Sequence, residues 1–136
     1  MARVLPPLDA REIGAVFVGG AIGTLARASL AQEFPHAPTS WPWPTFAVNI
    51  VAALLLGYFV TRLQERLPPS SYRRPLLGTG LCGGLSTFST MQVEIVRMLD
   101  VHAYTLAIGY AAASIAIGYG AIVLMTATVR RAWVLR

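Results

Sequence analysis

The stretch that decides the fold is Gly78-Thr79-Gly80-Leu81-Cys82-Gly83-Gly84-Leu85-Ser86-Thr87-Phe88-Ser89-Thr90. It lies inside an apolar segment that is long enough to cross a bilayer, and glycines and hydroxyl side chains crowd its middle. Because lipid offers no hydrogen-bond partner, unwound backbone is tolerated at membrane depth only where protein buries it or where it lines a watery path. Close helix packing explains the glycines but not the four hydroxyls around a single aromatic ring. The stretch therefore predicts a helix that is broken around residues 83–87 and that handles an ion.

The composition of the whole chain is that of an integral membrane protein. The chain has 136 residues, of which 55% are hydrophobic and 12% are charged. That charged share is about half of the share in an average soluble domain. Apolar segments over residues 13–30, 45–63, 76–96 and 104–129 each suit a span of roughly 20 residues. We expect a single all-α membrane domain over residues 1–136, with four spans and a broken third helix.

The charged and reactive residues exclude several classes of function. The net charge of +5 at pH 7 comes from arginines that border the spans, so lipid headgroups are an expected partner and nucleic acid is not. His36 and His102 lie in predicted loops with no second ligand nearby, and Cys82 lies within a span, where we expect it to pack. A metal site built from side chains is therefore not expected. The sequence contains no nucleophile–base pair, so we do not expect an enzyme.

The first span combines small residues with one charge. Gly14, Gly19, Gly20 and Gly23 give it a small-residue face, which predicts a tight contact with another helix. Arg27 lies near the end of this span. Its side chain either snorkels to the interface or acts as a structural anchor that binds backbone carbonyls.

Polar residues within the other spans are the candidate functional side chains. Asn49 either bonds a neighbouring helix or donates its amide to an anion, and Thr45 lies one turn earlier on the same face. Tyr110 and Ser114 are four residues apart on one face of the last span, which indicates a wet path or interhelical hydrogen bonds. Glu94 falls near the far end of the third span, where we expect its carboxylate to reach water.

Three motifs carry a resemblance to a known family. They are Gly19-Gly20-Ala21-Ile22-Gly23-Thr24-Leu25-Ala26-Arg27, Trp41-Pro42-Trp43-Pro44-Thr45-Phe46-Ala47-Val48-Asn49 and Gly80-Leu81-Cys82-Gly83-Gly84-Leu85-Ser86-Thr87-Phe88-Ser89-Thr90. In this order and spacing they make nearly the whole chain resemble the CrcB/Fluc fluoride channel family. The resemblance implies a four-span subunit that assembles as an antiparallel dimer in the inner (plasma) membrane. It also implies a passive channel that exports cytoplasmic fluoride and so lowers its toxicity.

The resemblance also implies which residues form the sites. It implies two fluoride pores along the subunit interface and a structural sodium ion at the dimer centre. The sodium ligands would be backbone carbonyls of the broken helix, those of Gly83 and Ser86. The positions that match the family's anion pore are Asn49, Phe88, Tyr110 and Ser114.

The chemistry of fluoride is compatible with these residues. Fluoride is small and strongly hydrated, so a pore must replace its water with directed hydrogen-bond donors. An aromatic ring has a positive edge, so Phe88 can meet an anion edge-on. Carbonyls that a helix break releases supply hard oxygen ligands for sodium without any carboxylate. The candidate donors to fluoride are the amide of Asn49 and the hydroxyls of Thr45, Ser89, Tyr110 and Ser114.

The chain departs from the family pattern at two pore positions and in its charge distribution. Met91 stands where the family usually has a second pore phenylalanine, and Gly118 replaces a hydroxyl in the last span. All 11 basic residues are arginines. Arg27 lies within a span, and Arg97 alone lies on one side of the four-span arrangement. The arginines expected on the other side are Arg3, Arg11, Arg62, Arg66, Arg73, Arg74, Arg130, Arg131 and Arg136. This imbalance predicts a single orientation with cytoplasmic termini, and it leaves open whether the partner is an identical copy or a paired homologous subunit.

Two other functions compete with the fluoride channel. A small proton-coupled multidrug exporter needs a buried carboxylate in its first span, where the only ionisable residue is Arg27. A non-conducting partner subunit of a heteromeric fluoride channel is compatible with Met91 and Gly118, because both would mark a degenerate pore.

Overall fold

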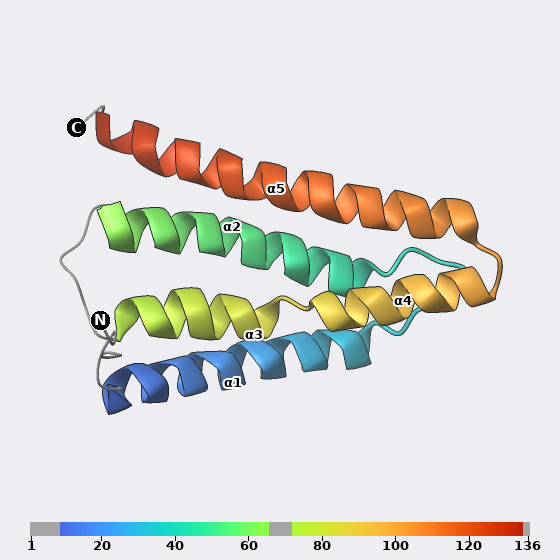
Figure 1. The fold of residues 1–136 in the computed structure, drawn as a ribbon, viewed down its shortest axis with the longest axis horizontal. Coiled ribbons are helices and arrows are strands. Elements are labelled where there is room, and N and C mark those ends of the chain that lie inside the picture. The colour runs from blue at the N-terminus through green and yellow to red at the C-terminus, as the bar shows by residue number, and fades with distance from the viewer. Residues whose placement is uncertain (1–8, 66–71, 135–136) are drawn as a thin grey trace, which may run out of the picture.

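The computed structural model describes residues 9–65 and 72–134, and these residues form an all-helical protein. The elements in chain order are α1 (Ala10–Glu33), α2 (Trp43–Glu65), η1 (Pro75–Cys82), α3 (Gly83–Leu85), α4 (Phe88–Asp100) and α5 (Tyr104–Val134). η1, α3 and α4 follow one line with an interruption at Ser86 and Thr87, and we call them together the broken helix. α1, α2, the broken helix and α5 lie lengthwise beside one another (Figure 1).

Three helices among the described residues are long and apolar enough to cross a membrane. They cover Ala10–Glu33, Trp43–Leu63 and Tyr104–Ala132. The broken helix is divided by its interruption, and neither half is long enough to cross a membrane by itself. Each of the three helices extends a few residues beyond the apolar segment seen in the sequence, because helix continues into the polar flanks.

Large apolar side chains remain exposed on the outer faces of α1 and α5. Water would oppose such faces, whereas lipid or a second membrane subunit can cover them. The most exposed of these side chains are Phe17, Leu25, Ile108, Ile115, Tyr119 and Leu124.

Glycines set the contact between α1 and the broken helix. A Cβ atom at Gly19 or Gly23 would overlap backbone atoms of Leu76 or Leu81, so only glycine fits there. The tight helix contact predicted for the first span is confirmed at these two positions. Gly14 has open space around it and takes no part in the contact.

The described arginines other than Arg27 and Arg97 lie at one end of the bundle. α1 begins, α2 ends, the broken helix begins and α5 ends at this end, as the colours of Figure 1 show. Arg97 lies in the last turn of α4, at the opposite end. Near the shared end the Nε of Arg130 donates to both carboxylate oxygens of Glu65 at 3.1 and 3.2 Å, which joins α5 to α2. Arg3, Arg66 and Arg136 lie outside the described residues.

Candidate functional site

The interruption of the broken helix is two residues long. Ser86 (φ −73°, ψ 154°) and Thr87 (φ −148°, ψ 117°) are both extended, so helix ends at Leu85 and begins again at Phe88. The structure therefore places the break within residues 83–87, where the glycines and hydroxyls of the sequence predict it.

Side chains take over the hydrogen bonds that the helix loses at the break. The Oδ1 of Asn49 accepts from the backbone N–H of Thr87 at 2.7 Å, and its Nδ2 donates to the carbonyl of Thr87 at 3.1 Å. The hydroxyl oxygen of Thr87 accepts from the N–H of Thr90 at 3.2 Å and so caps α4. Asn49 reaches across from α2, so the break is held by a neighbouring helix as well as by its own residues.

Because side chains receive these N–H groups, two backbone carbonyls are left without their helical donors. In a continuous helix the N–H of Thr87 would bond the carbonyl of Gly83, and the N–H of Thr90 would bond that of Ser86. Here Asn49 and the Thr87 side chain receive those two N–H groups instead. Gly83 and Ser86 are both exposed on the subunit surface. Their carbonyl oxygens thus fit the hard ligands that a small cation needs, and no cluster of acidic, histidine or cysteine side chains among the described residues offers a metal site.

Arg27 contacts the same end of the first half-helix. Its Nε donates to the carbonyl of Gly84 at 3.3 Å, so the structure favours the anchoring role over snorkelling. A cation near the C-terminal end of a helix also lies favourably in the field of its dipole.

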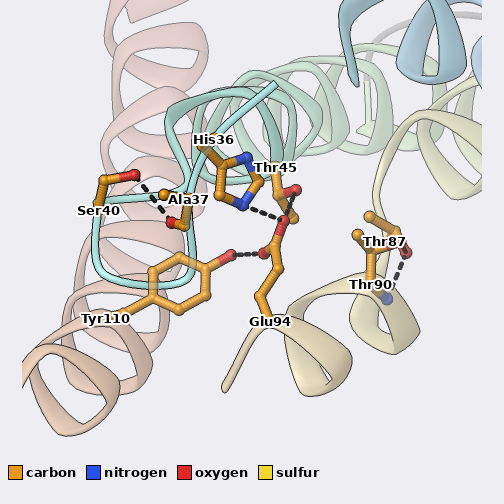
Figure 2. A network of polar contacts seen from close by, with 8 residues as sticks. All are labelled: His36, Ala37, Ser40, Thr45, Thr87, Thr90, Glu94 and Tyr110. Atoms are coloured by element: carbon orange, nitrogen blue, oxygen red, sulfur yellow. Dashed lines mark hydrogen bonds and ion pairs between the residues drawn. The ribbon is translucent and has the colours of Figure 1, made fainter. Parts of the chain in front are cut away.

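Glu94 lies in a buried hydrogen-bond cluster, as Figure 2 shows. The hydroxyl of Thr45 donates to its Oε1 at 2.5 Å, and the hydroxyl of Tyr110 donates to its Oε2 at 2.8 Å. The Nε2 of His36 lies 3.4 Å from Oε1. The expectation that this carboxylate reaches water is wrong, because residue 94 shares the buried face of α4 with Met91 and is only 6% exposed.

The structure brings Thr45 and Tyr110 together through a residue that was not among the predicted site residues. Both hydroxyls donate to Glu94 rather than facing an open path. The spacing of Met91, Glu94 and Met98 by three and four positions was the available signal, since it places Glu94 on the apolar face of an amphipathic helix. The contact of His36 had no such signal, because it arises from a loop.

The remaining predicted pore residues lie in three different environments. Phe88, the first residue of α4, is 72% exposed and Ser89 beside it is also exposed. Met91 is buried inside the subunit, where it packs with Met98 and Ala107. The hydroxyl of Ser114, one turn after Tyr110 on α5, is buried and has no hydrogen-bond partner within the part of the chain that the structure describes.

A cavity of about 320 Å³ adjoins the break. It lies between α2, the broken helix and α5, and its lining includes Asn49, Thr79, Gly83, Ser86 and Ile122. The cavity is partly open and mainly apolar, and Asn49, Gly83 and Ser86 meet along its lining.

Fold and site together define an all-helical, multi-pass membrane protein with a helix that is interrupted at Ser86 and Thr87. The family described as CrcB-like protein, Camphor Resistance (CrcB) matches residues 14–126. The chain belongs to this CrcB family, which confirms the resemblance seen in the sequence. As a member, it is a multi-pass protein of the plasma membrane and not an enzyme.

Relatives with a functional name are similar over nearly the full chain. Fluoride-specific ion channel FluC 1 of Mycolicibacterium paratuberculosis is 63% identical over 128 residues, which cover 94% of this chain and 97% of that protein. The protein of the same name from Mycobacterium bovis is 59% identical, over 93% of this chain and 96% of its own length. Fluoride-specific ion channel FluC 2 of Nocardia farcinica is 36% identical, over 95% and 91%.

Proposed function

We propose that this chain is the subunit of a passive, fluoride-selective channel that lets fluoride leave the cytoplasm. Membership of the CrcB family and the name of its relatives support fluoride as the ion. The observation that carries the proposal is the helix break, where Asn49 holds the backbone of Thr87 beside a partly open cavity. Hydrogen fluoride is a weak acid that enters cells uncharged and releases fluoride inside, so an outward leak is sufficient to lower its toxicity.

The broken helix serves in this proposal as a fourth span, and the subunit pairs with an oppositely oriented partner. Residues 75–85 precede the break and residues 88–100 follow it, so the break lies near the middle of this span. An antiparallel partner therefore brings its own break to the same depth. Phe88, Gly83 and Ser86 are exposed on the isolated subunit, and such a partner would cover them.

A structural sodium ion belongs to the same arrangement. The carbonyls of Gly83 and Ser86 from each of two subunits would hold it at the dimer centre. The ion would supply positive charge that draws the two breaks together, and this agrees with the loss of the helical donors to both carbonyls.

The donors for fluoride come from both sides of the break. Asn49 uses one amide N–H on Thr87 and has a second N–H to offer. Ser114 has its unpartnered hydroxyl, while Phe88 offers a ring edge and Ser89 a hydroxyl at the subunit surface. Thr45 and Tyr110 donate to Glu94, so a fluoride ion at these two hydroxyls would compete with the carboxylate for the same donors. Met91 packs in the core cluster that includes Tyr110 and so helps to hold that side chain in place.

A growth assay tests the proposed function in cells. Expression of the chain in a bacterium that lacks its own fluoride exporter should restore growth on medium with fluoride. The Phe88→Ile variant, which keeps an apolar side chain but removes the ring, should fail to do so at equal expression. Growth that the wild-type chain does not restore, at verified membrane expression, would contradict the proposal.

A further inference from the structure

His36 lies between solvent and the buried carboxylate of Glu94. Its side chain is 27% exposed, whereas that of Glu94 is 6% exposed, and the Nε2–Oε1 distance is 3.4 Å. The hydroxyl of Thr45 donates to the same oxygen, Oε1, and the hydroxyl of Tyr110 donates to Oε2 (Figure 2). The imidazole thus covers the approach to Glu94 from the connection between α1 and α2.

The connection that carries His36 is held in place by its own residues. Directly after His36, both the N–H and the hydroxyl of Ser40 donate to the carbonyl of Ala37, at 3.0 and 2.9 Å, and close a turn. Trp41 then packs edge-on against Tyr110, with ring centroids 5.5 Å apart. The residue that bonds Glu94 from α5 therefore also anchors the connection that bears His36.

The net charge of the His36–Glu94 pair depends on whether the imidazole is protonated. The titratable groups that meet here, among the described residues, are His36 from the connection, Glu94 from α4 and Tyr110 from α5, while α2 supplies the hydroxyl of Thr45. A protonated imidazole offsets the charge of an ionised carboxylate. A neutral imidazole leaves that negative charge uncompensated, and the charge then opposes the entry of an anion.

We propose that His36 is a positioning residue at the mouth of the anion path, and that its protonation speeds fluoride passage by neutralising Glu94. This inference rests on the proposed function. Histidine is the side chain whose charge ordinarily changes near neutral pH. Fluoride passage therefore rises as the pH falls, and this response belongs to one imidazole rather than to the whole pore.

Fluoride efflux from liposomes at two pH values tests the inference. Wild-type efflux, after subtraction of the leak from protein-free liposomes, should be about threefold or more faster near pH 6 than near pH 8. H36Q, which cannot become charged, should be slow at both values, and H36R, which keeps its charge, should be fast at both. The matched control is H102N, because His102 is the other histidine of the chain and its φ of 60° suits asparagine. H102N should keep the wild-type response.

An H36Q variant that keeps the wild-type pH response would overturn the inference. A wild-type protein that releases no fluoride at either pH would instead overturn the proposed function.

Discussion

Asn49 and Thr87 exchange two hydrogen bonds across the break, one at 2.7 Å and one at 3.1 Å. A single amide from α2 therefore gives the N–H of Thr87 an acceptor and also donates to its carbonyl, at a residue where the helix is interrupted. At membrane depth no water is present to bond an unpaired backbone group. The break therefore depends on the Asn49 side chain.

Replacement of Asn49 by Ala should destabilise the protein and slow fluoride efflux. The N–H of Thr87 would lose its acceptor, at a cost of about 1–3 kcal/mol. Thermal unfolding in detergent and efflux from liposomes would measure the two effects. Thr61→Ala is the matched control, because Thr61 is a buried α2 residue that bonds Thr126 far from the break. Wild-type unfolding and efflux in Asn49→Ala would refute this role.

Replacement of Phe88 by Ile should preserve assembly and slow efflux by about tenfold or more, because the isoleucine has no positive ring edge. The 72% exposure of Phe88 means that few contacts within the subunit are lost. Phe17→Ile provides the comparison, since Phe17 is a similarly exposed phenylalanine on α1. Efflux of Phe88→Ile that equals that of wild type would show that the pore assignment is wrong.

A bulky residue at Gly83 should disrupt the sodium site, whereas Ser86→Ala should keep it. In the proposed site backbone atoms would bind the ion, so loss of the Ser86 hydroxyl would leave the ligand in place. A Cβ at Gly83 meets nothing within its own subunit, so damage from Gly83→Val would arise at the partner. Dimer mass and a structure at high resolution would report both. Gly14→Val, also in open space on α1, should stay dimeric. An intact dimer with bound sodium in Gly83→Val would contradict the site.

Replacement of Glu94 by Ala should destabilise the protein because the hydroxyls of Thr45 and Tyr110 both lose their acceptor. The expected cost is about 1–3 kcal/mol for each hydroxyl left unsatisfied. Glu94→Gln keeps the shape and should unfold at a higher temperature than Glu94→Ala. Val93→Ala, at an exposed neighbouring position, should change the free energy of unfolding little. Equal unfolding temperatures for wild type and Glu94→Ala would argue against the cluster.

A C-terminal tag should report the orientation of the chain in cells. Apart from Arg27 within α1, the described arginines cluster at the end where α5 finishes, with Arg97 at the other end, so we expect the tag on the cytoplasmic side. A partner of opposite orientation would then be a homologous subunit. Substantial labelling on both faces, together with fluoride efflux from the protein purified alone, would instead support an antiparallel homodimer.

The sequence predicted those features that depend on local composition. Apolar length indicated the spanning helices, and the glycines with hydroxyls around Phe88 indicated the break. The close approach of α1 followed from the glycines of the first span, because small residues let helix backbones approach one another, although only Gly19 and Gly23 and not Gly14 are confined by it.

Features that depend on distant partners were not predictable in this way. The pairing of Asn49 with the backbone of Thr87 needs the relative register of α2 and the broken helix, which no spacing along one helix contains. Glu94 is buried although it is charged, because hydroxyls from α2 and α5 compensate for its burial. His36 reaches that carboxylate only through the path of a loop.

Fluoride efflux from liposomes that contain the purified chain alone tests the central claim most directly. A fluoride electrode outside liposomes loaded with potassium fluoride, with an ionophore to balance charge, would follow the release. We predict release well above that of protein-free liposomes, and no comparable release of chloride from matched liposomes. Fluoride release no faster than from protein-free liposomes, or equal release of chloride, would contradict a fluoride-selective channel built from this chain.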